Sequence, residues 1–185
     1  MFALSIKTKR LVLRPFTPAD APRVRELADE WDIARMTASI PHPYPEGLAE
    51  KWIAAHDGVR TAGKGYPFAI TLDGTLIGSV GADRNGTGAL ELGYWLGKPY
   101  WGRGIVTEAA AAVLDFCFGW LAVDRVYAGH LAENVASSRV LQKLGFAGDG
   151  CQERKSLALD KKVSCQMVVL TKDAWLKDTA AAKRV

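Results

Sequence analysis

Two short segments of the sequence carry residue types suited to binding and transferring a charged group. In the first, Gly102 and Gly104 come directly before an apolar stretch with helical spacing that begins at Ile105. The start of a helix presents unpaired N–H groups and the positive end of its dipole, and glycine lets the backbone approach a ligand closely. An anion such as a pyrophosphate is the natural ligand here, and a tight turn without a ligand is the alternative.

Two other phosphate-binding motifs are absent from this segment. No Gly-Lys-Ser/Thr sequence follows the loop, so the phosphate loop of nucleoside triphosphatases is excluded. A dinucleotide fingerprint requires a third glycine three residues after Gly104, and Thr107 stands there.

The second segment starts a later helix. Asn134 precedes an amphipathic stretch that ends at Gly145, and Ser137 follows three residues after Asn134. An asparagine at this place can cap the helix by accepting an amide N–H of the first turn. The alternative is that Asn134 and Ser137 face a ligand at the end of the preceding strand.

Metal and thiol chemistry have less support. Cys117, Cys151 and Cys165 are widely spaced and odd in number, so neither a disulfide framework nor a Cys-x-x-Cys metal site is predicted. Cys117 occupies an apolar helical position and is expected in the core. The three histidines show no metal-like spacing. We therefore predict no metal and an intracellular, cytoplasmic location.

The elements that must position these segments follow from hydrophobic periodicity and turn residues. They occur in the order β-α-α-β-β-β-α-β-α-β-β, and turn residues such as Asp73-Gly74 join the three central strands into an antiparallel meander. The pattern predicts an α/β (α+β) fold, a single domain over 1–185 with its core at 8–170, in which helices flank a mixed, mostly antiparallel sheet. The predicted ranges are 11–13, 18–31, 46–56, 68–72, 75–82, 89–96, 105–120, 125–130, 134–144, 151–159 and 163–170, with a short final helix after them.

Composition narrows the class of protein. The chain has 185 residues, of which 49% are hydrophobic and 24% charged, and this is typical of one globular domain rather than a disordered chain. A net charge of +4 is too mild to indicate a nucleic-acid partner. The apolar stretch 109–123 is interrupted by Asp115, and the apolar run at the start is too short for a signal peptide, so no membrane partner is expected.

Several motifs together resemble a known enzyme family. The run Tyr94-Trp-Leu96…Tyr100-Trp-Gly-Arg-Gly-Ile-Val-Thr-Glu-Ala109, followed by Asn134-Val-Ala-Ser137 and Lys143-Leu-Gly-Phe146, resembles the GNAT superfamily of acyl-CoA-dependent N-acetyltransferases. The segments 8–16, 41–45 and 91–96 are similar to its ribosomal-protein-alanine N-acetyltransferase branch, the RimJ/RimL type. The resemblance spans about Thr8 to Leu170. This chain has Trp101 and Val106 where the superfamily loop commonly has Gln or Arg first and Gly or Ala last, and Val106 puts the affinity for the cofactor in question.

The resemblance implies acetyl-CoA as the donor. It implies that the strand before the glycine loop splays from its neighbour, so that main-chain groups of Trp95 and Leu96 pair with the pantetheine amides like an added strand. Other residues expected to contact the donor are Gly102, Arg103, Gly104, Ile105, Val106, Thr107, Asn134, Ser137 and Arg139.

The resemblance also implies direct attack of a primary amine on the thioester in a ternary complex. About a tenth of an α-amino group is already neutral at pH 7, so a carboxylate acting through water suffices as the base. We predict that Glu91 has this role, and the alternative is a salt-bridged or solvated strand residue. Ser137 is the expected acid for the departing thiolate, with Tyr94 as a substitute.

The acceptor is expected between the first two predicted helices and the mouth of the glycine-loop strand. Because residues 40–44 contain no acidic side chain, we favour a protein or peptide N-terminal amine over a small amine such as an amino acid, polyamine or antibiotic. A non-catalytic CoA-binding module is a third interpretation, and a monomer and a homodimer stay equally open. The residues expected to line the acceptor site are Trp31, Met36, His42, Tyr44 and Tyr94.

Overall fold

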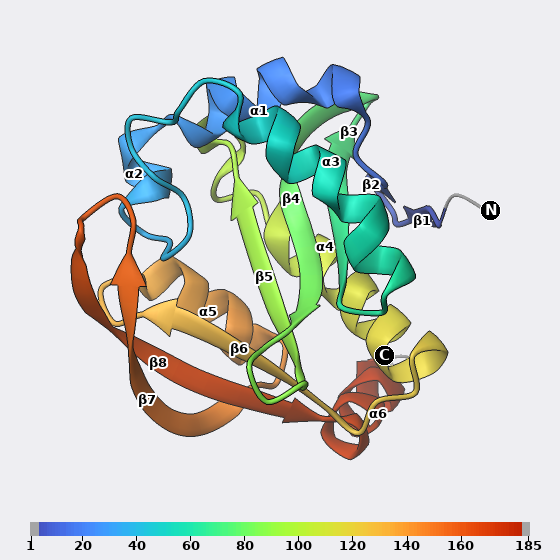
Figure 1. Ribbon diagram of the computed structural model, residues 1–185. Helices are drawn as coiled ribbons and strands as arrows, with labels where there is room; N and C mark the ends of the chain where they lie inside the picture. Colours follow the sequence, from blue (N-terminus) through green and yellow to red (C-terminus); the bar gives the residue numbers. More distant parts are fainter. Residues whose placement is uncertain (1–3, 183–185) are drawn as a thin grey trace.

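The computed structural model describes residues 4–182, and a single eight-stranded sheet runs through them (Figure 1). Its order is β1-β2-β3-β4-β5-β6-β8-β7, and neighbouring strands are antiparallel except for β5 and β6. The strands are β1 (Ile6–Lys7), β2 (Leu11–Arg14), β3 (Gly65–Leu72), β4 (Thr75–Arg84), β5 (Leu90–Leu96), β6 (Arg125–Leu131), β7 (Ala147–Ser156) and β8 (Lys161–Thr171).

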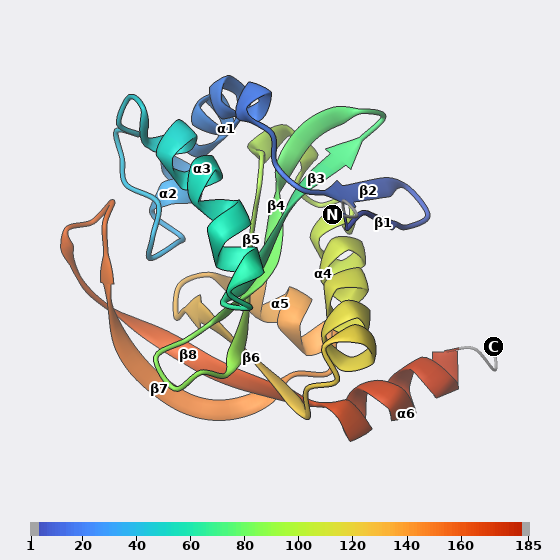
Figure 2. The same ribbon diagram turned by 45° about the vertical axis from the view of Figure 1, so that its right-hand side comes forward.

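Helices cover both faces of this sheet. In Figure 2, α1, α2 and α3 lie on one side of the strands, and α4 lies on the other. The helices are α1 (Ala21–Ala28), α2 (Trp31–Ala34), α3 (Leu48–Thr61), α4 (Ile105–Asp115), α5 (Val135–Lys143) and α6 (Lys172–Ala182). The predicted fold class is confirmed, and the element order matches except that β1 is added at the front and the first predicted helix is divided into α1 and α2.

Two buried clusters attach the helices to the sheet. On one face, Ile105, Ala109 and Val113 of α4 recur at helical spacing and pack with apolar side chains of β2 to β6. On the other face, α1, α2 and α3 pack with Ala69 and Leu76 of β3 and β4. The central strands β3 and β4 are therefore covered on both sides, which makes this part of the sheet a rigid frame.

Three predicted helices have different ends in the structure. The first predicted helix divides into α1 and α2, because Glu30 adopts an extended conformation and its side chain accepts the amide of Asp32. The second begins and ends later than predicted, over Leu48–Thr61. The long helix changes to a π-helix at Phe116–Trp120 after α4 ends.

β5 and β6 are the only parallel neighbours among the described strands, and they share fewer residue pairs than any other neighbours except those that involve the two-residue strand β1. β5 and β6 pair through Glu91 with Tyr127 and through Leu92 with Ala128, and no further pair follows. Beyond Leu92, β5 continues beside β4, whereas β6 pairs with β8, which pairs with β7 (Figure 1). We call β1 to β5 the first wing of the sheet, and β6, β8 and β7 the second, or far, wing. The residues 93–96 therefore have no strand partner on their β6 side.

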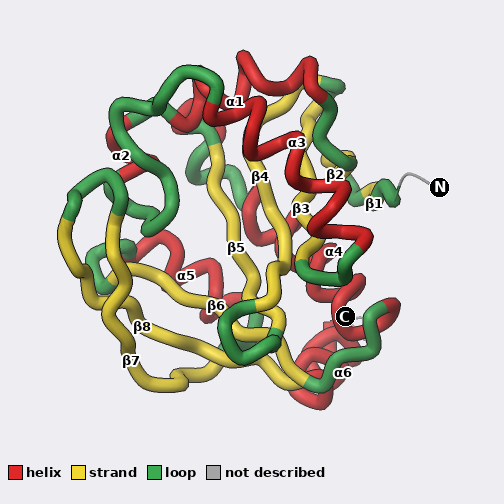
Figure 3. Tube along the Cα trace, in the orientation of Figure 1, coloured by secondary structure: helices red, strands yellow, loops and turns green. Residues whose placement is uncertain are grey.

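A long loop, 35–47, follows α2 and reaches the far wing of the sheet. Figure 3 shows this loop in green next to the turn that joins β7 to β8. The contact is direct, because the amide of Leu157 donates to the carbonyl of Ala38 over 3.0 Å. Within residues 4–182, no helix has the length and apolar character needed to cross a membrane.

Candidate active site

A cavity of about 1250 Å³ lies where β5 and β6 separate. Its walls include residues from α1 to α3 on one face of the sheet and from α4 and α5 on the other. The glycine loop and the loop 35–47 both contribute lining residues. The gap in the sheet thus joins two binding regions that approach it from opposite faces.

The glycine loop presents a run of unpaired amides to this cavity. Among the described residues, no acceptor is found for the amides from 102 to 107, and the first intrahelical bond of α4 runs from Glu108 to Gly104 over 3.1 Å. Gly102 and Gly104 have φ angles of 74° and 70°, in the left-handed region that other residues rarely adopt. Together with the helix dipole, these amides form a site for an anion.

Trp101 explains one departure from the superfamily loop. Its indole N–H donates to the carbonyl of Leu96 over 2.7 Å, which ties the start of the loop to the end of β5. This bond occupies one of the two acceptor positions of the Leu96 carbonyl. The side chain of Val106 is half-buried and packs with the core cluster of α4.

The N-terminal segment supports the loop from outside. Arg10 donates to Glu108 through its backbone amide and Nε, at 2.8 and 2.7 Å, and through Nη1 to the carbonyl of Arg103, at 2.9 Å. Burial acts to raise the pKa of Glu108, but hydrogen bonds from Thr8 and Arg10 outweigh it and lower the pKa, so the carboxylate stays charged. Sequence reasoning missed this contact because its partners are 98 residues apart.

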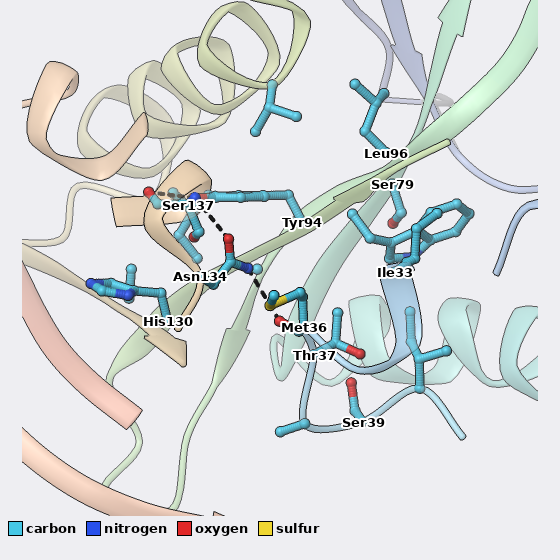
Figure 4. A pocket seen from close by; sticks show the side chains of 18 of the residues that line it. Ile33, Met36, Thr37, Ser39, Ser79, Tyr94, Leu96, His130, Asn134 and Ser137 are labelled. Atoms are coloured by element: carbon cyan, nitrogen blue, oxygen red, sulfur yellow. Dashed lines mark hydrogen bonds between the residues drawn. The ribbon is translucent and has the colours of Figure 1, made fainter. Parts of the chain in front are cut away.

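Tyr94 and Ser137 form a hydroxyl pair inside the cavity (Figure 4). Tyr94 Oη lies 2.8 Å from Ser137 Oγ, and either oxygen can be the donor. Burial raises the pKa of Tyr94 to about 12, although the hydrogen bond with Ser137 acts in the opposite direction. The phenol therefore keeps its proton at neutral pH and can donate it.

Asn134 caps α5, one of the two roles that the sequence left open for it, and its side chain also contacts a distant part of the chain. Its Oδ1 accepts the amide of Ser137 over 3.0 Å and caps α5. Its Nδ2 donates to the carbonyl of Met36 over 3.2 Å. The contact beyond the helix is thus with the loop 35–47.

Glu91 lies at the closed end of the gap and is salt-bridged. Both of its oxygens accept from the guanidinium of Arg154, at 2.6 and 2.9 Å, and its side chain is 17% exposed. The hydrogen bond with Glu91 is the largest influence on Arg154 and raises its pKa. Arg154 on β7 had no place in the sequence-based site, although it faces Glu91 across the cavity.

The residues expected to bind the acceptor divide into two groups. Met36, Tyr44 and Tyr94 line the cavity. Trp31 and His42 are not among its lining residues; their rings pack on each other with centroids 5.3 Å apart, and His42 Nδ1 lies 3.5 Å from Asp29. The periodicity of the first predicted helix could not reveal this, because Trp31 belongs to the separate helix α2.

The remaining expected cofactor contacts differ in what they can offer. Ile105 is buried in the core, so only its main chain can reach a ligand. Arg103 and Arg139 are exposed at the rim and line the cavity, as does Thr107. Arg103 also lies over the ring of Tyr100, 5.9 Å from its centroid.

These groups fit a CoA thioester. The unpaired amides of 102–107 suit a pyrophosphate, and the unpartnered edge at 93–96 suits a chain of amides that pairs like a strand. No group of three or more potential metal-binding side chains occurs in the part of the chain that the structure describes.

Comparison with known proteins gives a consistent family. Residues 10–147 match the profile of the acetyltransferase (GNAT) domain. The chain is 39% identical over 154 residues to the "Probable N-acetyltransferase YjcK" of Bacillus subtilis, covering 78% of this chain and 84% of YjcK.

Solved structures share the fold at low sequence identity. RimL, a ribosomal L7/L12 alpha-N-protein acetyltransferase in complex with coenzyme A, superposes with a TM-score of 0.81 at 18% identity, over 92% of this chain and 99% of RimL. The ribosomal-protein-S5-alanine acetyltransferase of Vibrio fischeri gives 0.78 at 20% identity, over 93% and 98%.

Proposed function

The chain belongs to the GNAT family of N-acetyltransferases, and from this premise we propose that it transfers the acetyl group of acetyl-CoA to the N-terminal α-amine of a protein or peptide. The observation that carries the proposal is the gap between β5 and β6, which joins a site for an anionic donor on one face to an acceptor region on the other. Two substrates that enter from opposite faces can meet there without an intermediate carrier.

The donor site follows from main-chain groups. The amides of 102–107 bind the phosphates, and the free edge of β5 pairs with the pantetheine arm. Bound acetyl-CoA supplies an activated thioester. Arg103 and Arg139 at the rim add positive charge that attracts the anionic donor.

Proton transfers fall to side chains near the gap. We assign the proton of the attacking amine to Glu91, acting through water, because Glu91 lines the cavity and is one of the last two paired residues of β5 before the gap. The Tyr94–Ser137 pair protonates the departing thiolate: Ser137 gives its proton and regains one from Tyr94, which in turn regains a proton from water. A thiolate needs only a weak acid, so a hydroxyl pair is sufficient.

The choice of an N-terminal amine rests on two features. Residues 40–44 of the acceptor region carry no acid, and the carboxylate of Glu91 is paired with Arg154, which disfavours a polycationic small amine. The structural similarity to RimL and to the S5-alanine acetyltransferase, whose names specify protein substrates, supports the same class. Three free cysteines fit a reducing compartment, so we place the activity in the cytoplasm.

An amine panel tests this proposal. Thiol release from acetyl-CoA is measured with N-terminal peptides, free amino acids, polyamines and aminoglycosides, and mass spectrometry locates the added acetyl group. We expect peptides to give the highest kcat/KM, with modification at the α-amine. A higher kcat/KM for a small amine would assign the enzyme to that class. A rise in melting temperature with acetyl-CoA but no turnover of any amine would indicate a non-catalytic CoA-binding module.

A further inference from the structure

The start of the loop 35–47 is anchored to two distant parts of the molecule. Three consecutive carbonyls accept hydrogen bonds from outside the loop: Met36 from Asn134 Nδ2 at 3.2 Å, Thr37 from Ser156 Oγ at 3.5 Å, and Ala38 from the amide of Leu157 at 3.0 Å. One anchor is therefore the cap of α5, and the other is the turn between β7 and β8. Residues 36–39, which we call the strap, line the cavity between these anchors.

The anchor at α5 is the side chain of Asn134, and its two hydrogen bonds fix the orientation of its amide group. Because Asn134 Oδ1 faces an amide and Nδ2 faces a carbonyl, only one orientation of its amide group satisfies both contacts. The same Ser137 whose amide is capped carries the hydroxyl that pairs with Tyr94. Figure 4 shows this continuous connection from Tyr94 through Ser137 and Asn134 to Met36.

We propose that Asn134 is a positioning residue for the acceptor: its amide sets the distance between the strap, which lines the acceptor region, and the Tyr94–Ser137 pair. The inference rests on the proposed function, in which the strap contacts the acceptor. It assigns Asn134 to the acceptor half of the site, whereas the sequence analysis predicts that Asn134 contacts acetyl-CoA. The two assignments predict changes in different constants.

The test replaces Asn134 by residues that still cap α5. Serine and aspartate are as good as asparagine at a helix N-cap, but neither can donate an amide N–H to Met36. For Asn134→Ser we expect the KM of the acceptor to rise about three- to tenfold, the size of effect for the loss of one hydrogen bond. The dissociation constant of acetyl-CoA, measured by calorimetry without acceptor, should stay within about twofold, because a twofold change is below the effect of one lost hydrogen bond.

Ser138→Ala is the matched control, since Ser138 lies in the same turn of α5 and its side chain contacts Gln142 rather than the strap. It should leave both constants unchanged. Asn134→Asp provides a second variant if the serine variant folds poorly, and it should raise the KM of the acceptor in the same direction. A weaker affinity for acetyl-CoA with an unchanged acceptor KM would overturn the proposal and make Asn134 a donor ligand.

Hydrogen exchange separates this proposal from the choice of substrate. The amides of residues 36–40 should exchange faster in Asn134→Ser than in the wild type, whatever the acceptor is. Unchanged exchange there would overturn the anchoring role by itself. If a small amine proves to be the substrate, the same KM comparison is made with that amine, so the N-terminal assignment can fail while the positioning role stands.

Discussion

Both oxygens of Glu91 accept hydrogen bonds from Arg154, whose strand β7 lies at the outer edge of the far wing of the sheet. The ion pair therefore spans the cavity and joins β5 to β7, although β6 and β8 lie between them. Glu91 thus has two candidate contributions, one to proton transfer and one to the spacing of the two wings, and these contributions respond differently to pH.

The first prediction separates these contributions. Glu91→Gln should lower kcat at pH 7 by about tenfold, because only about a tenth of an α-amine is neutral there without a base. If Glu91 accepts the proton of the amine, the deficit should shrink as the pH rises above about 8, because the amine then loses its proton to the solvent. Steady-state rates from pH 6 to 10 check this.

Glu153→Gln provides the control for that series. Glu153 lies on β7 and pairs with Lys162 at the surface, so the same substitution there should leave kcat unchanged. A deficit in Glu91→Gln that is constant across the pH range would leave Glu91 with the spacing role alone.

The second prediction concerns the hydroxyl pair. Ser137→Ala and Tyr94→Phe should each lower kcat by about ten- to a hundredfold with little effect on the affinity for acetyl-CoA, because the pair acts after the amine attacks. The double variant should be little slower than either single variant, as expected for two groups that work as one unit. Because the pKa of Tyr94 is about 12, its ionisation should not reduce activity below about pH 11. Additive effects in the double variant would show that the two hydroxyls act separately.

The third prediction concerns the amide run at the start of α4. Gly104 has a φ of 70°, which opposes a side chain by about 1–2 kcal/mol, so Gly104→Ala should shift the local backbone and weaken acetyl-CoA binding about tenfold. Gly86→Ala is the matched control, because a Cβ at Gly86 meets no atom within 4 Å and its φ is not in the left-handed region. Titration calorimetry gives both affinities, and equal values would contradict a role for this backbone in donor binding.

The fourth prediction is a dependence of stability on acid. Burial is the main influence on His56 and lowers its pKa from 6.5 to about 4, and neither ring nitrogen has a hydrogen-bond partner among the described residues. The unfolded chain therefore binds more protons than the native protein between these pH values, so stability is complete above about pH 6.5 and falls by up to about 3 kcal/mol toward pH 4. His56→Leu should flatten this part of the curve of melting temperature against pH. Parallel curves for the two proteins would contradict the prediction.

The fifth prediction concerns the thiols. Cys117 and Cys165 are buried, and burial raises the pKa of Cys117 to about 12 and also raises that of Cys165, whereas Cys151 is exposed. A chromogenic disulfide reagent at pH 8 should therefore react rapidly with one thiol per chain, and Cys151→Ser should remove this fast phase. A second fast thiol in the native protein would show that one of the buried cysteines is accessible.

The features that the sequence predicts well are those coded within a few neighbouring residues. Gly102 and Gly104 mark the loop and the start of α4, and Asn134 and Gly145 mark the two ends of α5, because caps and left-handed positions restrict which residue types can occur. Asp73-Gly74 likewise marks the hairpin between β3 and β4.

The contacts that the sequence could not predict join residues far apart in the chain. Arg154 meets Glu91 across 63 positions, and Asn134 meets Met36 across 98. From its neighbours in sequence, Arg154 would be placed at the surface and Asn134 in a helix cap. Only the packing of the two wings brings these side chains to their partners. The separation of Trp31 and His42 from the cavity has the same origin, since the ring of Trp31 on α2 packs on the ring of His42, which lies eleven residues later in the loop 35–47.

The short ladder between β5 and β6 has a mechanical consequence. With two residue pairs holding the parallel strands together, the seam between β5 and β6 has few main-chain hydrogen bonds. A donor bound in the gap would pair with the free edge of β5 in place of a neighbouring strand. The Glu91–Arg154 and Asn134–Met36 hydrogen bonds also connect the two sides of this seam. The substrate would then be a structural component of the enzyme, and the protein would become stiffer at the moment when it is ready to react.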